Sequence, residues 1–349
     1  MFTRRTLSKL LAGLSLAPAT ALSQGRPPLS RIAFGSCANQ TMAQPIWDAV
    51  LAYRPDLFIF AGDNVYGDFN APDAADLKRA YDEARRIAGY ARLRDTVSHL
   101  AVWDDHDYGV NDGGVEFPHK ALSKDLFLDF WNVPATDIRR RRDGIYDSRV
   151  IGPPGMRVQV ILLDVRWFRS PLKPTDQRGA PGKERYVPDL DPAKTMLGAE
   201  QWAWLAEELR KPAELRLVVS STQVLAEGHG WERWGNMPLE KQKLIDTIRA
   251  SGAKGVVLLS GDRHVGALYR EEPAGLYPLY EATSSGLNMV YWAAKEPGPN
   301  RLGALYAAAN FGVVDIDWWE RKLLLALRDD GGNTRRSVEI SFEALGIPA

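Results

Sequence analysis

The sequence predicts an α/β fold with a ligand site beyond the ends of its strands. Runs of apolar, often β-branched residues alternate with segments of helical periodicity from about residue 31 onward. Several of these runs end in a glycine that is followed at once by polar side chains. Buried strands read as continuous apolar stretches, and ligands bind beyond strand ends in α/β sheets. The two observations together predict a buried sheet with a site at one edge.

The first half of the chain alternates strands with helices. The apolar spacing of Ile46, Ala49 and Val50 supports a helix there, because the three residues recur on one helical face. From such patterns we expect strands at 31–36, 56–61 and 100–103, and helices at 44–53, within 73–98 (one or two) and at 120–131.

The second half is predicted to be more antiparallel. A hairpin turns at Gly152-Pro153-Pro154-Gly155, and two long loops, 170–195 and 226–238, are rich in Gly, Pro, Trp or charge. Long loops in compact domains are usually functional or disordered. The remaining expected elements are strands at 146–151, 158–164, 215–221, 255–260, 277–283, 311–317, 322–328 and 335–342, and helices at 198–210 and 239–251.

Composition excludes some classes of protein. The 349 residues include 44 Lys+Arg and 44 Asp+Glu, so the formal net charge is zero. A dedicated nucleic-acid-binding protein is normally strongly basic, so we expect no stable nucleic-acid partner. Hydrophobic residues make up 45% and charged residues 25%, as in ordinary globular proteins.

The first residues have the layout of a targeting segment. Adjacent arginines in Thr3–Lys9 precede a short apolar stretch, Leu10–Leu16, and small residues follow at Pro18–Ala21. This order predicts a twin-arginine signal peptide at 1–23, whereas a disordered basic tail is the alternative. We expect the chain to engage the twin-arginine export machinery and to be periplasmic or extracellular. We predict a linker at 24–30, one catalytic domain at 31–349 and no transmembrane segment in the mature chain.

Metal-ligating side chains follow four of the predicted strands. A thiol, a phenol, several carboxylates and two imidazoles at four strand ends indicate a metal centre. The segments are Gly35-Ser36-Cys37, Gly62-Asp63-Asn64-Val65-Tyr66, Trp103-Asp104-Asp105-His106-Asp107 and Gly261-Asp262-Arg263-His264.

Three residues of the first two segments suggest the type of ion. Asp63, in a tight turn, is the best candidate for a carboxylate shared by two ions, and Tyr66 follows three residues later. A phenolate and the thiolate of Cys37 together suit a strongly Lewis-acidic ion such as Fe(III). The alternatives are a turn aspartate, a packed tyrosine and a small buried cysteine.

Further residues are candidates for chemistry and substrate binding. His106 offers an imidazole that could act as a general acid or contact a phosphate. Arg166 follows a strand and could bind a phosphate oxygen. Arg263, between two ligands, is a candidate for substrate contact or for a hydrogen bond to a ligand. His229 lies in the 226–238 loop, either as a lid residue or as a satisfied polar residue.

Taken in order, the motifs resemble those of the alkaline phosphatase D family, part of the calcineurin-like metallophosphoesterase superfamily. The resemblance runs from about Arg31 to Thr283 and includes Leu163-Asp164-Val165-Arg166 as a fifth motif. It implies a four-layer α/β/β/α sandwich of two mixed sheets with metals at one sheet edge. It also implies that Fe(III) is held by Cys37, Asp63, Tyr66 and His264, and a second divalent ion, for which calcium is favoured, by Asp63, Asp105 and Asp262.

The sequence departs from the wider superfamily at several of these positions. Asp105 stands where the superfamily has the Asn of Gly-Asn-His, and Asp262 replaces the first His of Gly-His-x-His. The opening Asp-x-His is replaced by Ser36-Cys37. No His matches the ligand expected near Ser221-Thr222-Gln223, which leaves the second ion's ligand set open.

The resemblance implies an exported hydrolase of phosphoric esters in which a metal-bound hydroxide attacks in line. Its substrates would be small-molecule, lipid or nucleotide phosphate esters. A phosphodiesterase or phospholipase with the same site is one alternative, and the loops 170–195 and 226–238 would decide it. A non-catalytic metal- or phosphate-binding protein is an alternative of another class.

Overall fold

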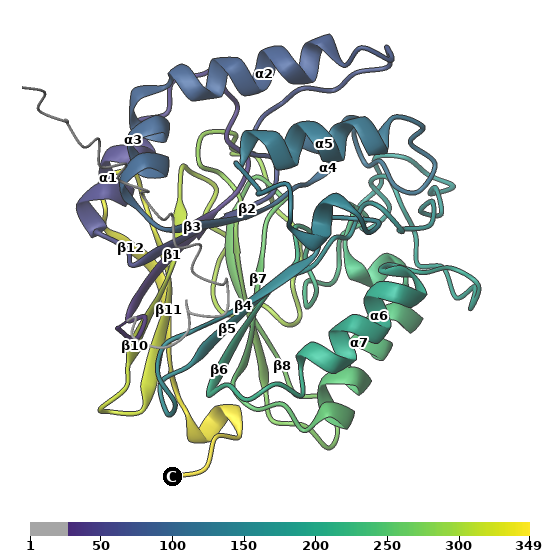
Figure 1. Cartoon of the computed structure of the whole chain (residues 1–349). Coiled ribbons are helices and arrows are strands. Elements are labelled where there is room, and N and C mark those ends of the chain that lie inside the picture. Colours follow the sequence, from purple (N-terminus) through teal and green to yellow (C-terminus); the bar gives the residue numbers. More distant parts are fainter. Residues whose placement is uncertain (1–26) are drawn as a thin grey trace, which may run out of the picture.

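Two mixed six-stranded sheets pack face to face and form the centre of the molecule (Figure 1). The structure, a computed structural model, describes residues 27–349. The predicted signal peptide and the first residues of the predicted linker lie outside the described residues. Residues 27–30 form no helix or strand, and Leu29 among them is buried in the core.

The first sheet has the strand order β12-β11-β10-β1-β2-β3. Its three N-terminal strands run parallel, and the three C-terminal strands extend it as an antiparallel meander. The strands are β1 (Arg31–Gly35), β2 (Leu57–Ala61), β3 (His99–Val102), β10 (Phe311–Asp317), β11 (Lys322–Arg328) and β12 (Thr334–Ser341).

The second sheet has the order β4-β5-β6-β7-β9-β8. Its four inner strands are parallel, and an antiparallel strand closes each edge. The strands are β4 (Asp147–Ile151), β5 (Val158–Leu162), β6 (Leu215–Val219), β7 (Val256–Ser260), β8 (Gly266–Glu271) and β9 (Leu279–Ser284).

Helices cover the outer faces of the sheets, which confirms the predicted four-layer α/β/β/α sandwich. Residues alternate between two cores along the inner strands: Val160 and Leu162 belong to the core between the sheets, whereas Ile161 packs with the helices outside the second sheet. The helices on the first sheet are α1 (Ile46–Tyr53), α2 (Ala75–Arg86), α3 (Ala88–Thr96), α4 (Asp105–Tyr108) and α5 (Lys120–Phe130), and those on the second are α6 (Gly198–Glu208) and α7 (Pro238–Ser251).

The observed elements agree closely with the sequence predictions, with two exceptions. The strand β8 and the one-turn helix α4 were not predicted. The helix α4 begins within the third metal-ligating segment, and β8 begins two residues after the fourth. Polar residues and short length there mask the periodicity on which sequence analysis depends. The loop 170–195 contains no regular helix or strand, as expected.

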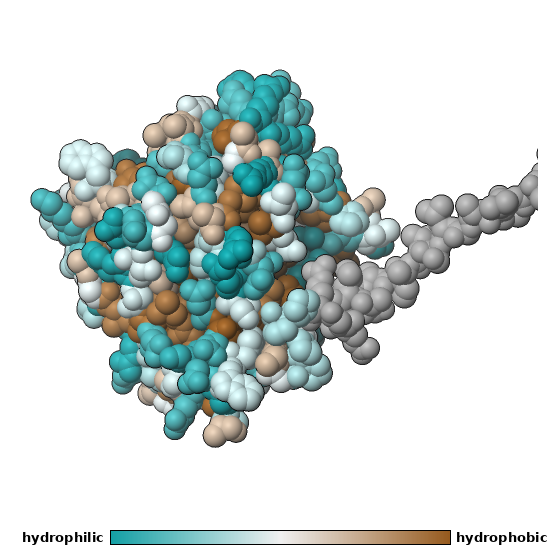
Figure 2. Space-filling model, turned by 90° about the vertical axis from the view of Figure 1, so that its left-hand side faces the viewer, coloured by the Kyte–Doolittle hydropathy of each residue, from teal (hydrophilic) through white to brown (hydrophobic). Residues whose placement is uncertain are grey.

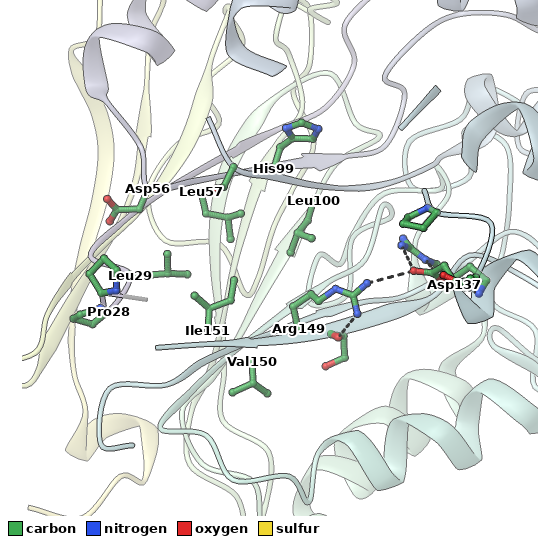
Figure 3. Close-up of a pocket in the computed structure, with 16 residues that line it drawn as sticks. Pro28, Leu29, Asp56, Leu57, His99, Leu100, Asp137, Arg149, Val150 and Ile151 are labelled. Atoms are coloured by element: carbon green, nitrogen blue, oxygen red, sulfur yellow. Dashed lines mark hydrogen bonds and ion pairs between the residues drawn. The ribbon is translucent and has the colours of Figure 1, made fainter. Parts of the chain in front are cut away.

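The sandwich is open along the edge where β3 and β4 face each other (Figure 3). A cavity of about 1120 Å³ lies there, with an apolar floor that includes Leu57, Leu100 and Ile151. The charged residues Asp137 and Arg149 at its rim pair with each other. Among the described residues, no cluster of metal-ligating groups lines this cavity. The side chains that could ligate a metal or take part in catalysis lie elsewhere.

Hydrophilic and hydrophobic residues are interspersed over the face that carries α1, α3 and β10–β12 (Figure 2). The large exposed apolar side chains of the described residues are far apart in the sequence, except for the adjacent pair Tyr291 and Trp292. In the described part of the chain, no helix combines the length and apolar character needed to cross a membrane.

Candidate metal centre

Strand ends from both sheets meet at one edge of the sandwich. The amide of Ser36 after β1 donates to the carbonyl of Ser284 in β9 at 3.1 Å, which joins the two sheets. Gly261 after β7 donates to the carbonyl of Ser221 at 2.9 Å. A Cβ at Gly261 would lie 2.4 Å from the Ser36 hydroxyl oxygen, so only glycine permits this close approach. Residues beyond β1, β2, β3 and β7 therefore face a common space.

Four of the residues beyond β1, β2 and β7 share an uncommon backbone conformation. The φ angles of Cys37, Asp63, Asp262 and His264 are 62°, 48°, 68° and 56°. Non-glycine residues adopt this left-handed region at a cost on the order of 1 kcal/mol or more, and such residues concentrate at functional sites. The chain thus holds strained backbone at four of the six positions where sequence analysis places a ligand, Tyr66 and Asp105 being the other two.

The first group of side chains gathers around the carboxylate of Asp63. The Cys37 sulfur and the Tyr66 hydroxyl each lie 3.4 Å from Asp63 Oδ2. The Tyr66 hydroxyl is 3.1 Å from His264 Nε2. A thiol, a carboxylate, a phenol and an imidazole therefore converge from three separate segments of the chain.

A second group contains only carboxylates and is linked to the first through Asp63 and Asp105. Oxygens of Asp104, Asp105 and Asp262 lie within 4.8 Å of one another, and Asp63 and Asp105 belong with His106 to another such group. Asp105 Oδ1 is buried without a hydrogen-bond partner among the described residues. An orphaned carboxylate oxygen aimed into a cluster of acids fits a bound cation.

The pKa values of these side chains also agree with a site for a bound cation. Burial raises the pKa of the Cys37 thiol to about 12, and burial with nearby negative charge raises the pKa values of Asp63, Tyr66 and Asp262 well above normal. Without a bound cation, the raised pKa values keep these four side chains protonated and neutral. Burial, assisted by Arg263 and His106, lowers the pKa of His264 to about 4, which leaves a neutral imidazole suited to ligation.

His106 lies beside both groups and is oriented by a neighbouring carboxylate. Its Nδ1 is 2.6 Å from Asp68 Oδ2, so Nδ1 carries the proton and Nε2 is the atom left for other contacts. Its ring packs on that of Tyr66 with 4.3 Å between centroids. Burial lowers the pKa of His106, but Asp105, Asp63 and Asp68 outweigh it and raise the pKa to about 10. The imidazole lines a cavity of about 340 Å³ together with Asp63, Asp105, Asp262 and His264.

Arg166 does not occupy the position that sequence analysis assigned to it. Its side chain is fully buried and does not line the cavity. Nε donates to Asp104 Oδ1 at 2.6 Å and Nη1 to Glu232 Oε2 at 2.7 Å. The guanidinium therefore stands behind the acidic group and neutralises buried carboxylates, so direct contact with a phosphate does not agree with its placement.

His229 is also withdrawn from the cavity. It is buried, and its Nε2 lies 3.0 Å from Gln223 Oε1. Gln223 in turn donates to the hydroxyls of Tyr269 and Thr283. Ser221, near the place of the missing histidine ligand, donates to Asp104 Oδ1 at 2.6 Å. The loop thus fills this region with a hydrogen-bonded network, and His229 supports the loop rather than facing a substrate.

Several residues that line the cavity escaped sequence analysis. Asp112, in a left-handed conformation, bonds to Arg185 and to the hydroxyl of Tyr186, and Trp231 forms part of the wall. Arg263 lines the cavity as expected, but its guanidinium is paired with Glu296. The only signal for Asp112 is the segment Asn111-Asp112-Gly113-Gly114, whose composition indicates a turn and carries no sign of a ligand.

Comparison with known proteins supports the same family as the motifs. A family model described as PhoD-like phosphatase matches residues 119–295, half of the chain. Alkaline phosphatase D of Bacillus subtilis (strain 168) is 24% identical over 298 residues, which cover 74% of this chain and 49% of that protein. The chain therefore spans about half the length of this curated relative.

Solved structures agree with the fold. A structure of PhoD matches 91% of this chain and 69% of its own with a TM-score of 0.66 at 16% identity. A purple acid phosphatase from yellow lupin matches 90% of this chain and 54% of its own with a TM-score of 0.57 at 12% identity. The family model, the curated relative and the sandwich fold agree, and the chain belongs to the PhoD-like phosphatase family.

Proposed function

We propose that this protein is a metal-dependent hydrolase of phosphoric esters. The observation that carries the proposal is the convergence of Cys37, Asp63, Tyr66 and His264 with the carboxylates of Asp105 and Asp262 beside a cavity. Membership of a phosphatase family supports it.

We assign these residues to two ions that share Asp63. Cys37, Tyr66 and His264 would complete the site of Fe(III), because phenolate and thiolate suit that ion. Asp105 and Asp262 would complete the site of a second divalent ion, and their hard oxygen ligands fit calcium. When bound, the ions would lower the pKa of water and neutralise charge on the phosphoryl group.

The remaining residues position the substrate and supply a proton. His106, fixed by Asp68, presents Nε2 toward the cavity, where it can donate to the leaving oxygen or to a phosphoryl oxygen. Arg166 holds Asp104 behind the ligands and keeps the acidic segment in place. Arg263 and Trp231 form the wall on the side of the loop 226–238.

Chelator-sensitive turnover tests the proposal. Purified protein should hydrolyse nitrophenyl phosphate, its bis(nitrophenyl) diester or both, and should lose that activity when metals are removed and regain it when they are restored. Absence of turnover on both esters by metal-loaded protein would favour a non-catalytic metal- or phosphate-binding role.

A substitution of His106 distinguishes a role in donating a proton from a purely structural role. The His106→Gln variant should lower kcat by on the order of 10²-fold or more on an alkyl phosphate ester, because its leaving oxygen must be protonated. On nitrophenyl esters, whose leaving groups depart without a proton, the loss should be much smaller. Equal losses on both substrates, measured at the same metal content, would contradict a role in protonating the leaving group.

We also propose that the chain is exported through the twin-arginine pathway with residues 1–23 as its signal. The adjacent arginines Arg4 and Arg5, the apolar stretch that follows and the small residues after it support this proposal. Replacing both arginines with lysine should retain the full-length chain in the cytoplasm, measured by fractionation and N-terminal sequencing. Normal export and processing of that variant would argue against the pathway.

A further inference from the structure

We propose that a second cavity beside the metal centre binds a phosphate group carried by the leaving group of the substrate. The inference rests on the proposed hydrolase function and specifies which esters the site prefers. It predicts a phosphodiester whose leaving alcohol bears a second phosphate.

The two cavities lie next to each other and share part of their lining. The second cavity, of about 490 Å³, shares Arg185, Trp231 and Tyr291 with the cavity that contains the metal-ligating groups. A phosphoryl group at the ligands would therefore have room beyond it, on one side, for a substituent. A small monoester would leave that room empty.

Two cationic side chains that line the second cavity have no partner among the described residues. Arg178 and Lys295 line it, are exposed, and form no ion pair or side-chain hydrogen bond within residues 27–349. The acids beside them are already engaged: Glu184 accepts from backbone amides of Gly182 and Gly230, and Glu296 pairs with Arg263. Because Glu184 keeps its negative charge, Arg178 and Lys295 leave the cavity with an excess of one positive charge, which favours an anion.

Aromatic side chains line the border that the two cavities share. Guanidinium groups of Arg263 and Arg185 lie 5.0 Å and 5.2 Å from the ring centroid of Trp231 and cover that ring. Tyr291 is 39% exposed and faces the same space, so its ring remains available to an apolar or planar part of a ligand. From the metal-ligating residues outward, the two cavities therefore present first the ligands, then the aromatic side chains of Trp231 and Tyr291, and then the unpaired side chains of Arg178 and Lys295.

The loops that build the subsite are fixed to each other. Backbone amides of Arg185 and Tyr186 both donate to the carbonyl of Gly230, at 3.0 Å and 2.7 Å. A Cβ at Gly230 would lie 2.5 Å from the amide nitrogen of Glu184, so glycine is needed for this contact. The loops 170–195 and 226–238, far apart in sequence, thus form one preformed wall.

The geometry points to a substrate of defined chemistry. Water adds its oxygen to the scissile phosphorus, the bond from phosphorus to the leaving oxygen breaks, and a proton passes to that oxygen. The released alcohol keeps its second phosphate, which Arg178 and Lys295 bind by charge-assisted hydrogen bonds. A nucleotide chain and a phosphorylated non-nucleotide alcohol share this chemistry, and only the former adds a planar base for Tyr291.

Matched substrates test the subsite. A dinucleotide with a terminal phosphate on its leaving half is compared with the same dinucleotide without it, and a glycerol phosphodiester is compared in the same two forms. The terminal phosphate should raise kcat/KM by about tenfold, as expected for two exposed charge contacts. In the Arg178→Gln/Lys295→Gln variant the ratio should fall to near one. A larger ratio for the dinucleotide pair, lost in Tyr291→Ala, identifies the nucleotide as the preferred source.

The control removes the same charge elsewhere. Arg54 and Arg86 are exposed and have no side-chain partner in the described part of the chain, so Arg54→Gln/Arg86→Gln should leave the ratio unchanged. The proposed subsite would be wrong if the terminal phosphate left kcat/KM of the wild type unchanged. It would also be wrong if the Arg178→Gln/Lys295→Gln variant kept the wild-type preference for the terminal phosphate. Binding of the phosphorylated alcohol, followed by tryptophan fluorescence, tests the subsite even if no ester is hydrolysed, so the two proposals fail separately.

Discussion

The Asp63→Asn variant should lose hydrolysis by on the order of 10³-fold or more and should bind less than the full complement of metal. Asp63 is the only described carboxylate that belongs to both the group with Cys37 and His264 and the group with Asp105 and His106. Asparagine matches aspartate in size and tolerates the left-handed backbone at this position, so the fold should be retained. Metal analysis and steady-state kinetics on the same preparation measure the effect.

Stability provides the internal control for this variant. Burial and negative neighbours raise the pKa of Asp63, so the metal-free variant should be at least as stable as metal-free wild type. Added metal should raise the Tm of the wild type much more than that of the variant. A matched Asp76→Asn substitution on the exposed side of α2 should change neither property. Full activity and metal content in Asp63→Asn would refute the shared-carboxylate assignment.

The Arg166→Met variant should have the largest effect on stability. Arg166 pairs with Asp104 and Glu232 in a fully buried network, and Glu232 retains a second partner in Arg169 at 3.1 Å. Breaking a buried ion pair by removing one member costs about 3–5 kcal/mol in the free energy of unfolding, because the other charge remains buried. Denaturant unfolding of the metal-free protein measures this cost directly.

A double-mutant cycle distinguishes the network from a phosphate contact. The combination of Arg166→Met with Asp104→Asn should cost less than the sum of the single changes, because the partner charge is then absent. A residue that binds phosphate would instead raise KM and leave the unfolding free energy nearly unchanged. A decrease of less than about 1 kcal/mol in the free energy of unfolding, together with a large rise in KM, would instead support a role for Arg166 in substrate binding.

Sequence patterns predicted most strands and helices and a site beyond the strand ends, whereas the four-layer sandwich followed from the family resemblance. Strands β1, β2 and β7 are continuous apolar runs, so the polar residues beyond them could be assigned to one sheet edge from the sequence alone. The same reasoning applied to Arg166 assigned the wrong surroundings. A position after a strand does not say whether a side chain turns toward the cavity or toward buried acids on the other side.

Sequence patterns could not predict which distant segments contact each other. The pair of His106 and Asp68 and the contact of Gly230 with the 183–186 segment depend on how loops fold against each other. Neither loop has a periodicity that reports its tertiary partner. The withdrawal of His229 has the same origin, because its hydrogen bond to Gln223 forms only when the loop folds over β6 and β9.

Metal analysis of the protein exported by its native route, combined with its turnover on a phosphate ester, tests the central claim most directly. The account predicts about one iron per chain and a second divalent ion, with turnover that disappears when both are removed. Under the proposed twin-arginine export, the chain would cross the membrane folded and keep the ions inserted in the cell, which heterologous expression can replace. Protein that contains no metal and still hydrolyses phosphate esters at the full rate would contradict the account.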